Sequence, residues 1–254
     1  MKEEIKDIEL ELSKFPSSVL DEFKTAMNSM NSMIEEPYFS SWARQGVQIA
    51  QKTVRSWEAA AEYYKASLDV SKFVSGADLL HWGQCGLNLC DQSPGLAVSF
   101  FKSSTGSRLQ NLNSKKMSDW AELGSRLYKG TWKSSALASK FFESSGSILE
   151  DLTDIELREF GDFVELISRK SIDVATECLI LSKDVLPSID SNRSDFIKMV
   201  SSVAENNWRE VKSCFEYAPR FIQSFEQSQR GRFINLSASI AKNNLPNLSL
   251  FLNE

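Results

Sequence analysis

The residues most able to do chemistry are one histidine and four cysteines. His81 is the single histidine among 254 residues, so any Ser-His or Cys-His mechanism would use it, and sites with several histidine ligands are excluded. Because it directly precedes Trp82, we expect a surface or interface side chain of a helix. Cys85 and Cys90 lie roughly 140° apart around a helix, and no second Cys-x-x-Cys completes a zinc set. We interpret all four as free, buried thiols: Cys85, Cys90, Cys178 and Cys214.

Serines and paired carboxylates offer two further kinds of chemistry. No Gly-x-Ser-x-Gly occurs, the turn that exposes a nucleophilic serine. The pairs Glu35 with Glu36 and Asp151 with Asp154 would suit a metal ion or acid-base catalysis, but no helical Glu-x-x-His accompanies them. We interpret them as solvated charges or charges at helix N-termini. The sequence therefore predicts a protein that is not an enzyme, with no catalytic, metal-binding or cofactor-binding residue.

Composition and charge narrow the classes of partner. The net charge is −5, and the basic residues are scattered among acidic ones, which argues against nucleic acid. No stretch approaches the roughly 18 apolar residues of a membrane span, and the N-terminus has no apolar signal segment. We therefore expect a cytoplasmic protein. With only 11 glycines and 6 prolines, the chain is also too poor in turn residues for an all-β fold.

The elements that must position these residues are predicted by an internal repeat. One phrase consists of two aromatics, a charge, a small residue and a serine, and a second phrase consists of a tryptophan followed four residues later by glycine. The first phrase occurs three times, at Tyr63-Tyr64, Phe100-Phe101 and Phe141-Phe142. The second pairs Trp42 with Gly46, Trp82 with Gly86 and Trp120 with Gly124, and similar steps continue to Phe160, Phe196 and Phe233.

These phrases predict an all-α fold, an α-solenoid of about six degenerate two-helix repeats of about 38 residues. Each aromatic anchor is expected to open one amphipathic helix, with Pro94 and Lys129-Gly130-Thr131 marking turns between helices. We predict two regions, N-terminal capping helices over residues 1–38 and a helical repeat domain over residues 39–254. The paired aromatics are expected to form the core between repeats; a groove for a hydrophobic ligand is the other interpretation.

The anchor and the residue one turn later are expected to share space within the core. Trp with Gly in the first three repeats gives way to Phe160 with Val164 and Phe196 with Val200, which roughly conserves total volume. On this interpretation, replacement of Gly124 by valine overpacks the core, and replacement of Trp120 by phenylalanine recovers part of the loss.

The phrases Trp-Ala-x-x-Gly and Tyr-Tyr-Lys-Ala-Ser resemble a helical-repeat region of some bacterial proteins that also carry a von Willebrand factor A domain. Those proteins are similar to nitric oxide reductase activation proteins, which cooperate with MoxR-type AAA+ ATPases. The A domain's Asp-x-Ser-x-Ser metal motif is absent here, since Asp69-Val70-Ser71-Lys72-Phe73 and Asp91-Gln92-Ser93-Pro94-Gly95 both lack the last serine. No phosphate-binding Gly-x-x-x-x-Gly-Lys-Ser/Thr occurs either. The resemblance implies an accessory or adaptor role and carries over no functional residue.

Two functions follow from the predicted architecture. The first is a non-catalytic scaffold or adaptor that binds another protein, because a solenoid presents a long surface; which face binds stays open. The alternative is an amphipathic helical coat or carrier on a lipid or polymer surface. The last repeat reaches Leu250-Phe251-Leu252 without a polar cap, so we expect self-association there, a covering partner, or a longer natural chain.

Overall fold

The computed structural model describes residues 2–104, 109, 112–189, 192–224 and 227–243. Within these residues the secondary structure is helical and contains no strand, which confirms the all-α prediction. The chain divides into two compact units, unit 1 over residues 1–125 and unit 2 over residues 126–254. None of the described helices is long and apolar enough to cross a membrane.

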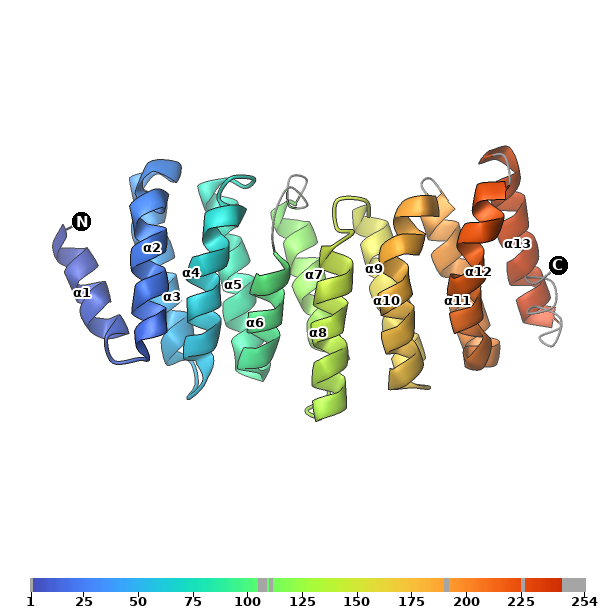
Figure 1. The fold of residues 1–254 in the computed structure, drawn as a ribbon, viewed down its shortest axis with the longest axis horizontal. Coiled ribbons are helices and arrows are strands. Elements are labelled where there is room, and N and C mark those ends of the chain that lie inside the picture. Colours follow the sequence, from blue (N-terminus) through green and yellow to red (C-terminus); the bar gives the residue numbers. More distant parts are fainter. Residues whose placement is uncertain (1, 105–108, 110–111, 190–191, 225–226, 244–254) are drawn as a thin grey trace. The chain divides into compact units, whose positions relative to one another are not determined.

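In unit 1, helices that are two places apart along the chain pack against each other. Contacts join α1 to α3, α2 to α4, α3 to α5 and α4 to α6. Figure 1 shows α2, α4 and α6 in one layer, in front of α3 and α5. The helices are α1 (Lys2–Leu12), α2 (Ser17–Met33), α3 (Glu36–Gln51), α4 (Ser56–Val70), α5 (Gly76–Gln92), α6 (Pro94–Ser103) and α7 (Ser114–Leu127), of which α7 crosses the division between the units.

Unit 2 follows the same packing rule. Contacts join α8 to α10, α9 to α11, α10 to α12 and α11 to α13. The elements are α8 (Trp132–Gly146), α9 (Asp154–Ser168), α10 (Ile172–Ile189), α11 (Arg193–Asn207), the short 3₁₀ helix η3 (Trp208–Glu210), α12 (Val211–Ser224) and α13 (Gln227–Asn243). Phe233 lies in α13, whereas Leu250-Phe251-Leu252 lies outside the described residues.

The predicted turn signals act at several helix starts. Pro94 is the first residue of α6, although the Ser93 side chain makes no capping hydrogen bond. Gly130 has a positive φ of 72°, a conformation that favours glycine, and it leads into a capping box between Thr131 and Ser134 at the start of α8. These local signals end one helix and begin the next within a few residues.

The aromatic phrases form the core, as the sequence predicts. All six paired rings are 0% exposed, as are the anchors Trp42, Trp82, Trp120 and Phe160. Tyr63 and Tyr64 also satisfy their hydroxyl groups inside the core. Tyr64 Oη donates to the Ala43 carbonyl at 2.8 Å, and Tyr63 Oη donates to Gln45 Oε1 at 3.1 Å. The rings therefore bury large apolar areas at no cost in unpaired hydroxyls.

The anchors do not open their helices, so that part of the prediction is wrong. Helices α3, α5, α7 and α9 each begin six residues before the anchor. The anchor therefore occupies the second turn, where neighbouring helices cover it on several sides. The first turn lies nearer solvent and carries capping residues such as Ser75, which accepts a hydrogen bond from the Asp78 amide.

The glycines one turn after the anchors make room for a ring from another helix. A Cβ at Gly46 would lie 2.1 Å from Tyr64 Cζ, and one at Gly86 would lie 1.9 Å from Phe101 Cζ. The sequence interpretation assigned this space to the anchor tryptophan of the same helix. The second aromatic of the following helix fills it instead, because packing between helices, and not spacing along one helix, brings the backbone and the ring together.

Candidate functional site

The four cysteines are buried and free in the structure. Burial raises the pKa of Cys85 and Cys90 to about 11 and that of Cys178 and Cys214 to about 12. The reactive thiolate is therefore scarce at neutral pH. Among the described residues, no group of three or more histidine, cysteine, aspartate or glutamate side chains gathers where it could hold a metal ion.

His81 lies partly buried on α5, and its Nε2 atom is 2.8 Å from Ser118 Oγ on α7. Asp78, one turn earlier on α5, accepts hydrogen bonds from Ser114 and Ser75, which lower the pKa of its carboxyl. Although serine, histidine and aspartate are neighbours here, Ser118 lies inside a helix, where backbone amides bond to carbonyls four residues back. The His81–Ser118 and Ser114–Asp78 hydrogen bonds link α5 to α7.

The two acidic pairs from the sequence lie at helix starts. Glu36 is the first residue of α3 and Glu35 is its N-cap, where negative charge stabilises the helix dipole. Asp151 and Asp154 flank the start of α9, and Asp151 Oδ1 lies 3.9 Å from an Arg193 nitrogen. These positions agree with their interpretation as charges at helix N-termini.

A polar groove runs between α3 and α5 in unit 1. Its volume is about 520 Å³. Arg44, Gln48 and Gln84 line it as exposed side chains, and Gln45 lies almost buried at its base. Gln45 Nε2 donates to the Leu80 carbonyl at 3.0 Å. The rest of the lining consists of Ser41, Ala77, Leu80 and His81.

A second, smaller groove lies between α5 and α7. Its volume is about 180 Å³, and exposed Asn88 and Gln92 project from α5 along it. Gln84 Nε2 donates to Asn88 Oδ1 at 2.8 Å, which joins the polar linings of the two grooves along one helix. Gln92 in turn donates to Ser125 Oγ. Successive grooves of unit 1 therefore carry exposed amide side chains.

The sequence analysis did not identify these amide residues, although their fixed distance from the anchor tryptophans indicates them. Gln48 lies six residues after anchor Trp42, and Asn88 lies six residues after anchor Trp82. Exposed positions recur at fixed offsets from the anchors, and polar side chains occupy them. Alignment of the chain on its anchors would therefore have revealed the lining.

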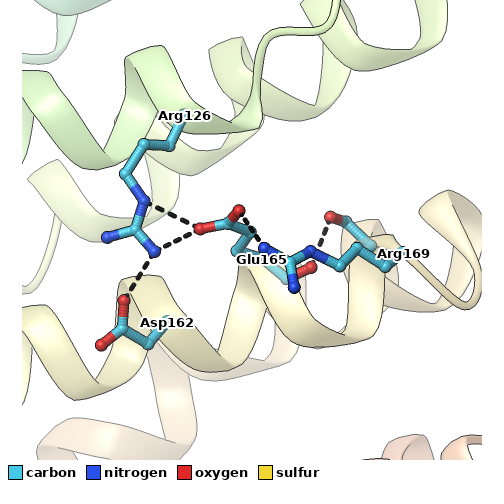
Figure 2. Close-up of polar contacts among 5 residues, drawn as sticks. Arg126, Asp162, Glu165 and Arg169 are labelled. Carbon is cyan, nitrogen blue, oxygen red and sulfur yellow. Dashed lines mark hydrogen bonds and ion pairs between the residues drawn. The ribbon is translucent and has the colours of Figure 1, made fainter.

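Unit 2 holds a charged cluster on α9 and at Arg126 (Figure 2). Arg126 Nε donates to Glu165 at 2.8 Å, and Arg126 also pairs with Asp162 at 2.8 Å. Arg169, the C-cap residue of α9, pairs with Glu165 at 2.7 Å. Burial opposes ionisation of Glu165, but the hydrogen bonds from Arg169 and Arg126 outweigh it and hold the pKa of this carboxyl below its usual value. The charged groups of the cluster pair with one another, and these pairs join the end of α7 to α9.

Such polar links recur at a characteristic sequence separation in both units. In unit 1, Arg44 on α3 pairs with Glu4 on α1, 40 residues earlier, and Gln51 donates to Glu11 at the same separation. In unit 2, Lys183 on α10 pairs with Glu143 on α8, again 40 residues earlier. In these three cases a side chain joins a helix to the next helix but one.

No protein-family model matches the chain, and neither a curated protein nor a solved structure shows significant similarity to it.

Proposed function

We propose that the chain is a non-catalytic helical-repeat scaffold whose unit 1 binds an extended segment of another protein. The observation that carries this proposal is the amide-lined groove between α3 and α5, continued by a second groove between α5 and α7. On this view the helix pairs are repeats of an α-solenoid, and the contacts at separations near 38 residues are contacts between neighbouring repeats.

Amide side chains suit the backbone of an extended peptide. Each glutamine or asparagine offers two N–H donors and a carbonyl acceptor, which match the carbonyl and N–H groups of a peptide in any sequence. Sites for small molecules are mostly apolar with a few polar groups, whereas six of the eight residues around the first groove are polar. A peptide backbone satisfies that lining better than an apolar ligand does.

The alternative of an amphipathic coat would leave apolar helix faces free to lie on a surface. In unit 1 the apolar faces of α3 to α6 pack on one another, and the large aromatic side chains of these faces are fully buried. This packing favours the scaffold. We also propose, from the resemblance of its phrases, that the scaffold serves in the cytoplasm as an accessory to an AAA+ ATPase or A-domain system.

The test is a selection of binding peptides. A library of random linear peptides is displayed against the whole chain, and the affinity of enriched peptides is measured by fluorescence anisotropy. The double variant Gln84→Ala with Asn88→Ala should weaken binding about 30-fold, because two hydrogen bonds of about 1 kcal/mol each are lost. Its matched control, Asn28→Ala with Asn31→Ala, removes two exposed amides from α2 and should leave affinity unchanged.

Equal affinities for the groove variant and the control variant would place the peptide elsewhere and refute the groove as the binding site. Failure to enrich any peptide would count against the binding of extended segments altogether. Circular dichroism of both variants separates loss of binding from loss of fold.

A further inference from the structure

Three turns of unit 2 lie along one edge of its α8, α10 and α12 layer. They cover residues 128–131 before α8, residues 169–171 before α10, and residues 208–210, the single 3₁₀ turn η3, before α12. Helix α10 packs against both α8 and α12. The Lys183–Glu143 ion pair joins α10 to α8, and the Lys212–Glu177 ion pair joins α12 to α10. The three helices run in the same direction (Figure 1), so their N-terminal ends lie at the same edge. Figure 1 shows these ends at the lower side of α8, α10 and α12. We call it the turn edge.

The turn edge is basic in a chain that is acidic overall. Its turns and the first residues of the following helices carry six basic residues: Lys129, Lys133, Arg169, Lys170, Arg209 and Lys212. The acidic residues in the same segments are Asp173 and Glu210. The net charge of the turn edge is thus opposite in sign to the chain's net charge of −5.

Four of these basic side chains are available to a partner. Arg169 pairs with Glu165, and Lys212 pairs with Glu177 and Glu216. Within the described part of the chain, no ion pair engages the other four, which are all exposed: Lys129, Lys133, Lys170 and Arg209.

Helix dipoles add to this positive charge. The N-terminal end of a helix carries partial positive charge and is stabilised by acidic residues, as α9 is by Asp154 and Glu156. Helices α8 and α12 have no acidic residue in the first turn, and α8 instead begins beside Lys129 and Lys133. Basic residues at the start of α8 oppose its helix dipole.

Exposed tryptophan accompanies the charge. Trp132, the first residue of α8, is 77% exposed, whereas the anchor tryptophans are fully buried. The Lys133 ammonium lies 5.7 Å from the centre of its ring. In the third turn, the Arg209 guanidinium lies 4.9 Å from the centre of the Trp208 ring. Tryptophan beside basic residues is typical of side chains that sit at the headgroup level of a bilayer.

We propose that the turn edge binds an anionic lipid surface. Its basic groups lie in or beside successive turns along one edge. A negatively charged bilayer can therefore contact several of them at once. An acidic peptide or a nucleic acid would gain less from Trp132, whose ring enters the headgroup layer while Lys129 and Lys133 meet lipid phosphates. This binding is separate from the groove of unit 1, so either site can fail without the other.

The test measures flotation of the whole chain with vesicles. The chain should bind vesicles of phosphatidylcholine mixed with phosphatidylserine, bind pure phosphatidylcholine vesicles far less, and lose binding as salt screens the charges. Each basic residue near an anionic bilayer contributes roughly fivefold in affinity, so Lys129→Glu with Lys133→Glu should lower the partition coefficient by about 25-fold or more. That change also places acidic residues at the start of α8, so the fold is retained.

The matched control is Lys24→Glu with Lys65→Glu, which makes the same change in net charge at exposed positions of α2 and α4. It should bind nearly as well as the unmodified chain. Trp132→Ala should weaken binding and reduce the blue shift in tryptophan fluorescence that accompanies insertion.

Equal binding to neutral and anionic vesicles would overturn the proposal, and so would equal losses in the charge-reversed variant and its control. Tighter binding to polyglutamate or to a DNA duplex than to anionic vesicles at the same salt concentration would also overturn it.

Discussion

Replacement of Gly86 by alanine tests the close approach of α5 to Phe101. The new Cβ would lie 1.9 Å from Phe101 Cζ and 2.4 Å from Cε1, far inside contact distance. The ring cannot swing into solvent, because it is 0% exposed and packs on Trp82 and Tyr63 with centroids 4.8 and 5.4 Å away. The helices or the ring must shift to admit one methyl group.

The magnitude follows from two opposing effects. Alanine stabilises a helix interior by about 1 kcal/mol relative to glycine, whereas overpacking a closed core costs about 1 to 3 kcal/mol. With the ring enclosed, we expect the upper end of that range and a net loss of about 2 kcal/mol in the free energy of unfolding. Urea denaturation followed by circular dichroism measures it.

The control is Gly95→Ala, in the first turn of α6. Its Cβ would meet only Ser93 Oγ, at 3.6 Å, so the variant should be as stable as the unmodified chain or slightly more stable. The two glycine variants should therefore differ in sign.

A double-mutant cycle identifies the ring that fills the space. Phe101→Leu shortens the clashing side chain, and combined with Gly86→Ala it should show a coupling of about 1 kcal/mol or more. Trp82→Phe, one turn before the glycine on α5, should show a smaller coupling, because the three atoms nearest to the new Cβ all belong to Phe101 and Trp82 acts only through the Phe101 ring packed on it. Additive effects with Phe101→Leu, or a coupling with Trp82→Phe as large as that with Phe101→Leu, would refute the assignment of this space to Phe101.

Three further predictions concern buried groups. Tyr64→Phe removes the bond from Tyr64 Oη to the Ala43 carbonyl and should lower the free energy of unfolding by about 1 kcal/mol, measured by urea denaturation; an unchanged midpoint would contradict the bond. Glu165→Gln should cost about 1 to 3 kcal/mol at pH 7 by removing bonds between charged groups. Because the folded pKa of Glu165 lies below its usual value of 4.5, its contribution is full above pH 4.5 and is lost as the pH falls through the folded pKa, so the two unfolding curves should converge in acid; a constant difference would argue against the charged cluster. The four cysteines, with pKa values raised to about 11 or 12, should resist a thiol reagent near neutral pH until denaturant is added; labelling of the folded chain would show an accessible thiolate.

The core was predictable because its residues recur as recognisable phrases. Trp42, Trp82 and the paired aromatics identified the buried rings without any structure, since large rings at a fixed period have few other uses. Their helix starts were misplaced by six residues, because anchors mark the centre of packing and caps mark the ends. The partner of Gly86 was assigned to the wrong ring, because spacing along one helix does not reveal which side chain a neighbouring helix supplies.

The two proposed binding surfaces depend on the same information that a sequence lacks. Gln84 and Asn88 are ordinary polar residues until α3 and α7 are placed beside α5, which turns them into the lining of neighbouring grooves. The sequence predicts a turn at Lys129-Gly130-Thr131. Its charge becomes part of a larger basic surface only because α8, α10 and α12 run parallel and bring Lys170 and Arg209 to the same edge. Each turn, with the first residues of the helix that follows it, carries two basic residues, which is ordinary for a surface loop. Because attraction to a charged surface grows with each added basic residue, the alignment of three turns makes the turn edge a candidate for binding that none of them would be alone.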